Sequence, residues 1–288
     1  MELDLGSIEK PVRMLRRSLK RLTDEPPVAE VHNLRIYARR VEALAAALMP
    51  GDKKLMRRLM KAVRPMRKAA GEVRDMDVLA GKALALSRHR RDHSVVCLRK
   101  HLRSMRIESA RELLDTVAEQ RSDARRSLKQ LSRQIEKRLH GKRVRAMTEA
   151  VAGGPSGEAA TRLIDELSRW PDFSEENLHA FRIKVKELRY LLQLAHDGSP
   201  KFVRALGNVK DQIGDWHDWH QLAKIAAKVL NPQDDRAALE KIDKIGREKL
   251  ERALAAARTV KPRYLSRFAQ AGKTSDLKTT SNPAQTRI

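Results

Sequence analysis

Aromatic residues are scarce in this chain: only ten of its 288 residues are Phe, Trp or Tyr, which is 3%. Proteins that read RNA or single-stranded nucleic acid usually stack the bases on aromatic side chains. This scarcity therefore disfavours base recognition. It leaves open the binding of duplex DNA through its backbone, which needs no aromatic platform.

Cysteine and long apolar runs are also nearly missing. A single cysteine, Cys97, excludes an intramolecular disulfide framework and suits a reducing compartment. No apolar run approaches the ~18–20 residues of a membrane span, and residues 1–11 lack the apolar core of a signal peptide. We therefore expect a cytoplasmic protein without a membrane span.

Motifs of catalysis are absent as well. The chain has no glycine-rich phosphate loop, paired-carboxylate signature or nucleophile motif. His217 and His220, and also His89 and His93, have zinc-compatible spacing, but no cysteine or carboxylate cluster accompanies them in both halves. Cys97 lacks a Cys–His arrangement in the sequence, so we expect an inert thiol. These patterns predict a protein that is not an enzyme and that holds no metal or cofactor.

Acidic residues are few compared with basic ones. The chain has 61 Lys and Arg against 37 Asp and Glu, a net charge of +24, of which residues 1–150 carry +18. Such an excess destabilises a compact chain by self-repulsion, so an anionic partner is its simplest explanation. Nucleic acid, an anionic membrane surface and a smaller polyanion all fit, and the scarcity of aromatic residues favours phosphate recognition without bases.

Helix-forming residues and helical spacing of apolar positions dominate, and no convincing strand pattern occurs. The sequence predicts an all-α fold, with breaks at prolines and glycines. The glycine-rich stretch 152–157 divides the chain into two halves, and the polar tail 272–288 is predicted to be disordered. The expected helices are about 9–23, 28–48, 52–70, 73–91, 94–140, 158–169, 175–196, 200–213, 215–230 and 233–268.

One predicted helix carries an unusual face. In "VHNLRIYARR", His32, Arg35 and Arg39 lie within about 60° of each other around the helix, with no acidic residue among them. Surface helices usually mix signs, because like charges three or four residues apart repel. If the pattern occurred once, a solvated charged face would be the simpler interpretation.

The pattern occurs twice. "LHAFRIKVKELRY" repeats it in the second half of the chain, and "GDWHDWHQL" follows there as a repeat of "GEVRDMDVL", with the order kept and the spacing nearly kept. The matched pairs are His32 and His179, Arg35 and Arg182, Arg39 and Lys186, Gly71 and Gly214, and Asp75 and Asp218. Ile36 and Ile183 also match beside the basic residues, which indicates a partly dry wall where charge on phosphate is less screened. The repeat predicts two related helical bundles.

Other basic residues extend the pattern. Arg189 lengthens the second stripe, and Lys210 matches Arg67. Arg64, Arg67 and Arg74 share one helical side if the helix continues through Gly71. Two interpretations are open for them: they line the same site as the basic stripes, or they form a solvated face. Asp75 and Asp218 stand beside Arg74 and His217, which favours a structural ion pair or a helix-start cap over a general base.

These four motif blocks, in this order, resemble the CHAD family (conserved histidine α-helical domain) over about residues 5–268. The resemblance implies two pseudo-symmetric helical bundles around a basic central cavity that binds inorganic polyphosphate without catalysis. The chain departs from the pattern at Glu187, which stands where Arg40 has its match, and at Trp216, His217 and Trp219. These departures leave the second half's share of the phosphate contacts open.

We therefore expect a CHAD-like domain over 1–271, with halves of about 1–150 and 158–270. The resemblance also makes polyphosphate granules a location to consider. Nucleic acid is expected only as a weaker competing polyanion. The alternatives are a module that binds the nucleic-acid backbone and a metal-dependent enzyme acting on phosphate chains or esters. The expected polyphosphate-binding residues are His32, Arg35, Arg39, Arg40, Arg64, Arg67, Arg74, His179, Arg182, Lys186, Arg189 and Lys210.

Overall fold

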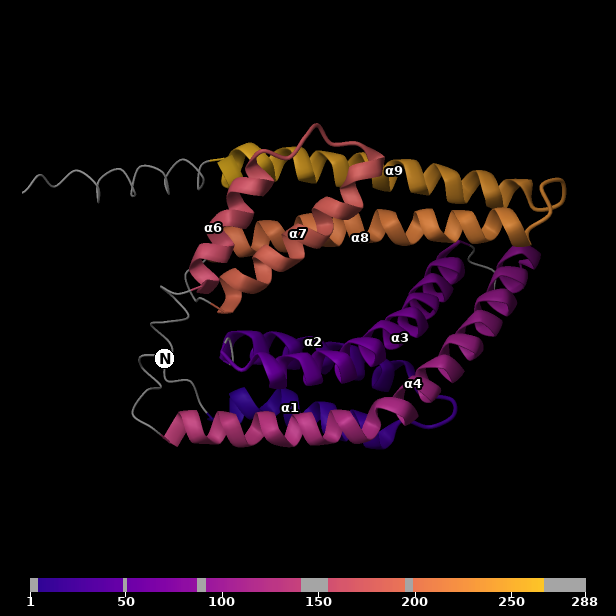
Figure 1. Cartoon of the computed structure of the whole chain (residues 1–288). Helices are drawn as coiled ribbons and strands as arrows, with labels where there is room; N and C mark the ends of the chain where they lie inside the picture. The colour runs from indigo at the N-terminus through magenta and orange to yellow at the C-terminus, as the bar shows by residue number, and fades with distance from the viewer. Residues whose placement is uncertain (1–4, 49–50, 87–91, 141–154, 195–198, 267–288) are drawn as a thin grey trace, which may run out of the picture. The chain divides into compact units, whose positions relative to one another are not determined.

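The protein is built from α-helices. The computed structural model describes residues 5–48, 51–86, 92–140, 155–194 and 199–266, and these ranges contain eight α-helices and no strand. The all-α prediction is thereby confirmed. The helices are α1 (Leu5–Arg21), α2 (Val28–Leu48), α3 (Lys53–Ala85), α4 (His93–His140), α6 (Pro155–Ser168), α7 (Glu175–Leu194), α8 (Pro200–Val229) and α9 (Arg236–Val260), followed by a short π-helix, η1 (Lys261–Ser266) (Figure 1). The predicted disordered tail lies outside the described residues.

Local signals in the sequence account for several helix starts. The Asp52 carboxylate accepts a hydrogen bond from the Leu55 amide at 2.9 Å, and the Asp92 carboxylate accepts one from the Ser94 amide at 3.1 Å. Each bond satisfies an amide that has no partner within its own helix. Pro155 and Pro200 open α6 and α8, where the amide hydrogen that proline lacks is not needed.

Two helices are longer than the sequence predicted. α3 runs without interruption through Gly71, and α8 runs through Gly214, so the predicted breaks at these glycines are wrong. A glycine inside a helix costs only about 1 kcal/mol relative to alanine, and burial of Val73 and Trp216 on the same helices outweighs it. The breaks predicted at the proline-containing segments 26–27, 171 and 231–232 are confirmed.

The chain divides into two compact units. The first unit contains residues 1–146 and 221–242. Its helices α1 to α4 pack against one another (Figure 1). Helix α1 contacts α2 and α4, and α3 contacts the same two helices. Its core contains fully buried leucines from all four helices, among them Leu15, Leu34, Leu59 and Leu98.

The connection between α8 and α9 belongs to this first unit. The Ser94 hydroxyl at the start of α4 donates a hydrogen bond to the Asp235 carboxylate at 2.6 Å. The Lys241 ammonium group donates to the Leu86 carbonyl just after α3. Residues 221–242 are therefore fastened to the ends of α3 and α4 by buried or half-buried polar contacts.

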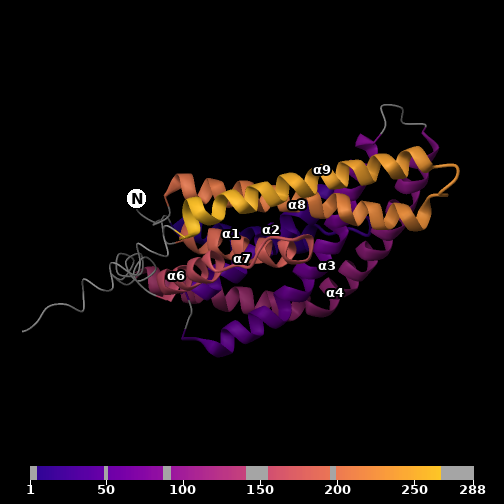
Figure 2. The ribbon, with the colours of Figure 1, turned by 90° about the horizontal axis from the view of Figure 1, so that it is seen from above.

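The second unit contains residues 147–220 and 243–288. α6 packs on α7 and η1, and one core cluster joins these elements to α8 and α9. α8 and α9 lie side by side and antiparallel in both ribbon views (Figures 1 and 2), and the Lys249 ammonium bonds the Asp215 carboxylate at 2.7 Å. The ring centroids of Phe173 and Phe181 are 4.8 Å apart inside this core.

The few described aromatic residues are buried or half-buried within the two units. Phe173, Phe181, Phe202, Trp216 and Trp219 are buried, and the other three described aromatic side chains, Tyr37, Trp170 and Tyr264, are half-buried. No described aromatic side chain is therefore presented on an open surface.

The predicted halves, about 1–150 and 158–270, describe a repeat in the sequence. The compact units follow a different division, since residues 221–242 join the first unit. The domain boundaries of the repeat therefore stay a prediction. No helix in the described part of the chain is long and apolar enough to cross a membrane.

Candidate anion-binding site

The first unit presents basic side chains on α2. The apolar side of this helix, with Leu34, Ala38 and Val41, is fully buried. The opposite side carries His32 and Arg40, which are exposed, and Arg35 and Arg39, which are half-buried. The Arg40 guanidinium lies over the Tyr37 ring, 5.7 Å from its centroid. The predicted stripe on this helix is therefore accessible to a ligand.

α3 adds basic residues to the same region. Burial lowers the pKa of His32, and the charges of Arg74 and Arg35 lower it further. Arg74 on α3 thus lies close enough to act electrostatically on His32 of α2. The continuous α3 also meets the condition under which Arg64, Arg67 and Arg74 share one side. We call the seven predicted residues of this unit the α2–α3 patch: His32, Arg35, Arg39, Arg40, Arg64, Arg67 and Arg74.

Arg67 has a carboxylate partner within its unit. Its Nε atom donates to Glu42 Oε1 of α2 at 2.9 Å, and both side chains are largely shielded from solvent. This ion pair neutralises part of the charge that the sequence assigned to the site. Arg64, one turn earlier on α3, is exposed.

The second unit holds a corresponding set on α7 and α8. Burial lowers the pKa of His179, and the charges of Arg182 and Lys186 lower it further. His179 is exposed, whereas Arg182, Lys186 and Arg189 are half-buried. Lys210 of α8 is half-buried and forms an ion pair with its neighbour Asp211. We call the five predicted residues of this unit the α7–α8 patch: His179, Arg182, Lys186, Arg189 and Lys210.

Arginines of the histidine-bearing helices lie against glycines of the neighbouring helices. A Cβ atom on Gly71 would lie 3.9 Å from Arg35 Nε, and one on Gly214 would lie 2.8 Å from Arg182 Nη2. Arg182 Nε also donates to the Lys210 carbonyl at 3.3 Å. The two glycines that were expected to end helices therefore provide room for guanidinium groups.

Arg189 has a similar neighbour. A Cβ atom on Gly207 would lie 3.5 Å from Arg189 Nε, which is buried without a hydrogen-bond partner among the described residues. Continued along α7, the sequence repeat matches Arg189 to Glu42. Continued back along α8, it matches Gly207 to Arg64. Across these two matched pairs, the basic residue is thus Arg64 on α3 in the first unit and Arg189 on α7 in the second. In the sequence, this exchange shows only as two separate mismatches between the repeats.

Two isoleucines border the patches. Ile36 is half-buried, and Ile183 is 52% exposed, although both were expected beside a partly dry wall. Within the second unit alone, Ile183 leaves an apolar group open to solvent next to Arg182.

His217 is a further residue near the α7–α8 patch, and it was not among the predicted site residues. Its ring centroid lies 4.6 Å from that of His179, with the ring planes inclined by 40°. Three residues later, His220 Nδ1 lies 3.3 Å from Glu175 Oε1. The repeat matches His217 to Arg74, and this match was the signal that could have identified it.

Other predictions about single residues need correction. Asp75 and Asp218 lie in the interiors of α3 and α8, so the helix-start cap is wrong for both. Cys97 does have a histidine neighbour, because its Sγ atom lies 3.5 Å from His93 Nε2, one turn away on α4. The described residues contain no group of three His, Cys, Asp or Glu side chains placed to hold a metal ion, and His89 lies outside them.

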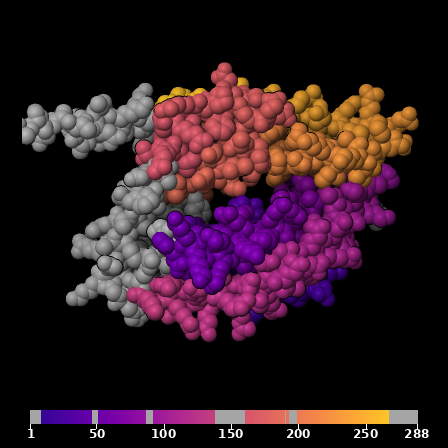
Figure 3. Space-filling view, in the orientation of Figure 1, coloured from indigo at the N-terminus to yellow at the C-terminus, as the bar shows by residue number. Residues whose placement is uncertain are grey.

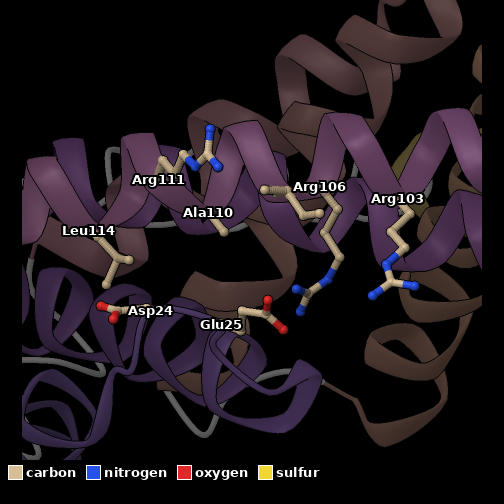
Figure 4. Close-up of a pocket in the computed structure, with 8 residues that line it drawn as sticks. Asp24, Glu25, Arg103, Arg106, Ala110, Arg111 and Leu114 are labelled. Atoms are coloured by element: carbon tan, nitrogen blue, oxygen red, sulfur yellow. The ribbon is translucent and has the colours of Figure 1, made fainter.

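A separate cleft of about 400 Å³ lies between α4 and the connection from α1 to α2 (Figure 4). Arg106 crosses it, donating to Asp77 at 2.7 Å and to the Pro26 carbonyl at 2.8 Å. Asp24 and Glu25 line the same cleft together with Arg103 and Arg111. These opposite charges largely offset each other, so the cleft has little net positive charge to attract an anion. The outer side of α4 itself is open to solvent (Figure 3).

A family comparison matches the CHAD domain to residues 7–227, which is more than half of the chain. The chain belongs to the CHAD domain family. The predicted family is therefore confirmed, and CHAD domains are generally binding modules.

Two solved structures share the fold of this CHAD domain. PptA from Streptomyces chartreusis has a TM-score of 0.59 and 14% identity, with 90% of this chain and 96% of that chain covered. The crystal structure of the CHAD domain from the plant Ricinus communis has a TM-score of 0.51 and 19% identity, with 93% and 88% covered. A comparison with curated proteins found no match.

Proposed function

We propose that this CHAD domain binds inorganic polyphosphate through the α2–α3 patch and the α7–α8 patch, without catalysis. Polyphosphate binding is known for the family. Arginine offers a planar fork of donors for phosphate oxygens, lysine acts as a point charge, and histidine donates from both nitrogens once it is protonated. The two patches supply all three groups.

The observation that carries the proposal is the paired placement of Arg35 on Gly71 and Arg182 on Gly214. In both units, an arginine three residues after the histidine lies along the neighbouring helix at a matched glycine. A cation held in place before binding loses less conformational entropy when it contacts the ligand. An unspecific solvated face would have no reason to repeat this packing.

The same pairing supports an internal duplication with His32 matched to His179. The family resemblance implies that the two matched patches line one basic central cavity, and we include that cavity in the proposal. A single flexible polyanion could then contact both patches, with counterion release contributing to affinity, as it does for nucleic acids.

Burial of the aromatic side chains favours polyphosphate over nucleic acid. Base stacking contributes about 1–3 kcal/mol per base where aromatic platforms exist. The described aromatic residues of this chain are buried or half-buried in the two units. A nucleic acid would therefore gain only phosphate contacts, which a bare phosphate chain makes without the bulk of sugars and bases.

The test compares long-chain polyphosphate, RNA and duplex DNA of equal phosphate count at ~150 mM salt, the physiological range. We expect far tighter binding of polyphosphate, with log affinity falling steeply against log salt. Equal affinity for RNA would favour the nucleic-acid alternative. Release of phosphate with added divalent metal would favour the enzyme alternative.

Association with polyphosphate granules follows from the same proposal. A fluorescent fusion of the full chain should concentrate on granules in cells that store polyphosphate and should become diffuse when the polymer is depleted. A fusion that stays diffuse in both conditions would contradict granule association.

A further inference from the structure

The α7–α8 patch contains a pair of imidazoles in direct contact. His179 of α7 is exposed and His217 of α8 is half-buried, and their ring centroids are 4.6 Å apart. The buried Trp216 ring lies next to the pair, with its centroid 6.2 Å from that of His217 and the two ring planes inclined by 62°. Two neighbouring imidazoles can bind one ligand oxygen together, and histidine is the side chain whose unperturbed pKa lies near physiological pH.

The α2–α3 patch has a permanent cation at the matched position. The repeat that matches Gly71 to Gly214 also matches Arg74 to His217. The charge of Arg74 helps to lower the pKa of His32, after burial. At the matched place in the second unit, the His217 ring contacts the His179 ring. The histidine of the first unit thus has a neighbour that is always charged, whereas the histidine of the second has a neighbour that can lose its charge.

The charged surroundings of the pair come from three helices. Burial lowers the pKa of His179 most, and on α7 the charges of Arg182 and Lys186 disfavour its protonated form further. Two nearby carboxylates have partners within the unit: Glu175 contacts His220, and Asp215 bonds Lys249 of α9. Asp218 follows His217 on α8, and Lys210 lies two turns before it. Cations thus face the pair from α7, so an anion that offsets them favours its protonation.

We propose that His179 and His217 form an anion subsite whose contacts with phosphate depend on proton uptake. The inference rests on the proposed polyphosphate binding. At higher pH, each neutral imidazole offers one donor and no charge. At lower pH, protonation adds charge and donors to both rings, and a phosphate oxygen bound by both rings offsets their mutual repulsion. The α7–α8 patch then strengthens on acidification, while Arg74 keeps its contribution to the α2–α3 patch constant.

Reciprocal substitutions test the inference. His217→Arg makes the second position permanently charged, and Arg74→His makes the first position titratable. Affinity for long-chain polyphosphate is measured between pH 8 and pH 5.5 at constant ionic strength. This probe suits the test because its internal phosphates keep their charge throughout that range.

We expect the wild-type affinity to rise as the pH falls. Each proton taken up contributes at most about tenfold per pH unit. His217→Arg should bind more tightly than wild type at pH 8 and show a flatter profile. Arg74→His should bind more weakly at pH 8 and show a steeper one. Calorimetry in buffers of different ionisation enthalpy should show fewer protons taken up by His217→Arg.

His101→Arg is the matched control, because His101 is an exposed histidine on α4 outside both patches. It adds the same charge and should leave the pH profile unchanged. If the wild type binds polyphosphate and both reciprocal variants keep its pH profile, the subsite is wrong while the proposed function stands. If the wild type binds no polyphosphate at any pH, the proposed function itself fails.

Discussion

Arg182 Nη2 lies where a side chain at residue 214 would begin: a Cβ atom on Gly214 would stand only 2.8 Å from it. Gly214→Ala should therefore displace the guanidinium. In a helix interior, alanine is more favourable than glycine by about 1 kcal/mol, and Arg182 is long enough to move aside. We expect the melting temperature of the ligand-free protein to hold or rise, while polyphosphate affinity falls about threefold or more, equivalent to about 0.7 kcal/mol.

Gly246→Ala provides the control for that variant. Gly246 lies on α9 in the second unit, and a Cβ atom there would meet nothing within 4 Å. It should gain the same helix stability and bind polyphosphate like wild type. Wild-type binding by Gly214→Ala as well would mean that the position of the Arg182 guanidinium is unimportant.

Removal of charge from either patch should weaken polyphosphate binding without unfolding the protein. Loss of one partner of a partly buried charged contact costs ~2–5 kcal/mol, whereas an exposed contact contributes ~0–1 kcal/mol. We expect at least about a tenfold loss for Arg35→Ala with Arg39→Ala, and for Arg182→Ala with Lys186→Ala. The first pair should have the larger effect, since residues 1–150 carry +18 of the net charge.

Arg125→Ala with Lys129→Ala is the matched control. These residues are exposed on α4 and have the same spacing of four. They should reduce affinity only slightly, through net charge, and melting temperatures should hold or rise because like-charge repulsion is relieved. If both patch variants bind like this control, the patches are solvated surface.

Glu42→Gln should strengthen binding. The Glu42 carboxylate holds Arg67 Nε at 2.9 Å and offsets its charge within the α2–α3 patch. Its replacement releases a guanidinium for phosphate and raises the local charge by one. We expect polyphosphate affinity to rise about two- to fivefold, with stability lowered by about 1 kcal/mol or less, as for a partly exposed ion pair. Asp123→Asn, which removes an exposed carboxylate paired with Arg126 on α4, should change affinity less.

Asp235 should make stability depend on acid pH. Its hydrogen bond from the Ser94 hydroxyl, helped by the Asn231 amide and the charge of His93, holds the pKa of the carboxyl below its usual value, although burial opposes them. A pKa that is lower in the folded state stabilises the fold at pH values above the pKa of the unfolded state, which is about 3.9. This contribution disappears as the pH falls below that value and through the folded one.

Asp235→Asn should therefore lose about 1.5–3 kcal/mol of unfolding free energy at pH 7, the range for hydrogen bonds to charged groups. Urea unfolding should show a smaller difference from wild type at pH 3 than at pH 7. Asp234→Asn, at the exposed neighbouring position, serves as the control and should stay near wild type. A difference that is equal at the two pH values would contradict the assigned role of the carboxylate.

The local periodicity of the sequence was sufficient to predict most of the helices. On α2, Leu34, Ala38 and Val41 recur at the helical spacing of apolar residues, and all three are fully buried. The same periodicity placed His32, Arg35 and Arg39 together on another side. Contacts within one helix depend on residues a few positions apart, so they can be read from the sequence.

Contacts between helices could not be predicted in this way. Gly71 and Gly214 were expected to end helices, because the room that they leave for Arg35 and Arg182 depends on the packing of a second helix. The Glu42–Arg67 ion pair joins residues 25 positions apart on different helices. The contact between His179 and His217 likewise depends on how α7 lies on α8, which no periodicity specifies.

The assignment of residues 221–242 to the first unit has a consequence for the order of synthesis. Helices α1 to α4 leave the ribosome long before these residues, and residues 147–220 separate the two parts of the unit. At a translation rate of ~5–20 residues per second, this interval lasts about 4–15 s. Throughout it, Ser94 lacks Asp235 and the Leu86 carbonyl lacks Lys241. The first unit to be translated is thus completed by the segment that joins α8 to α9, and a nascent chain that stalls before residue 242 leaves it unfinished.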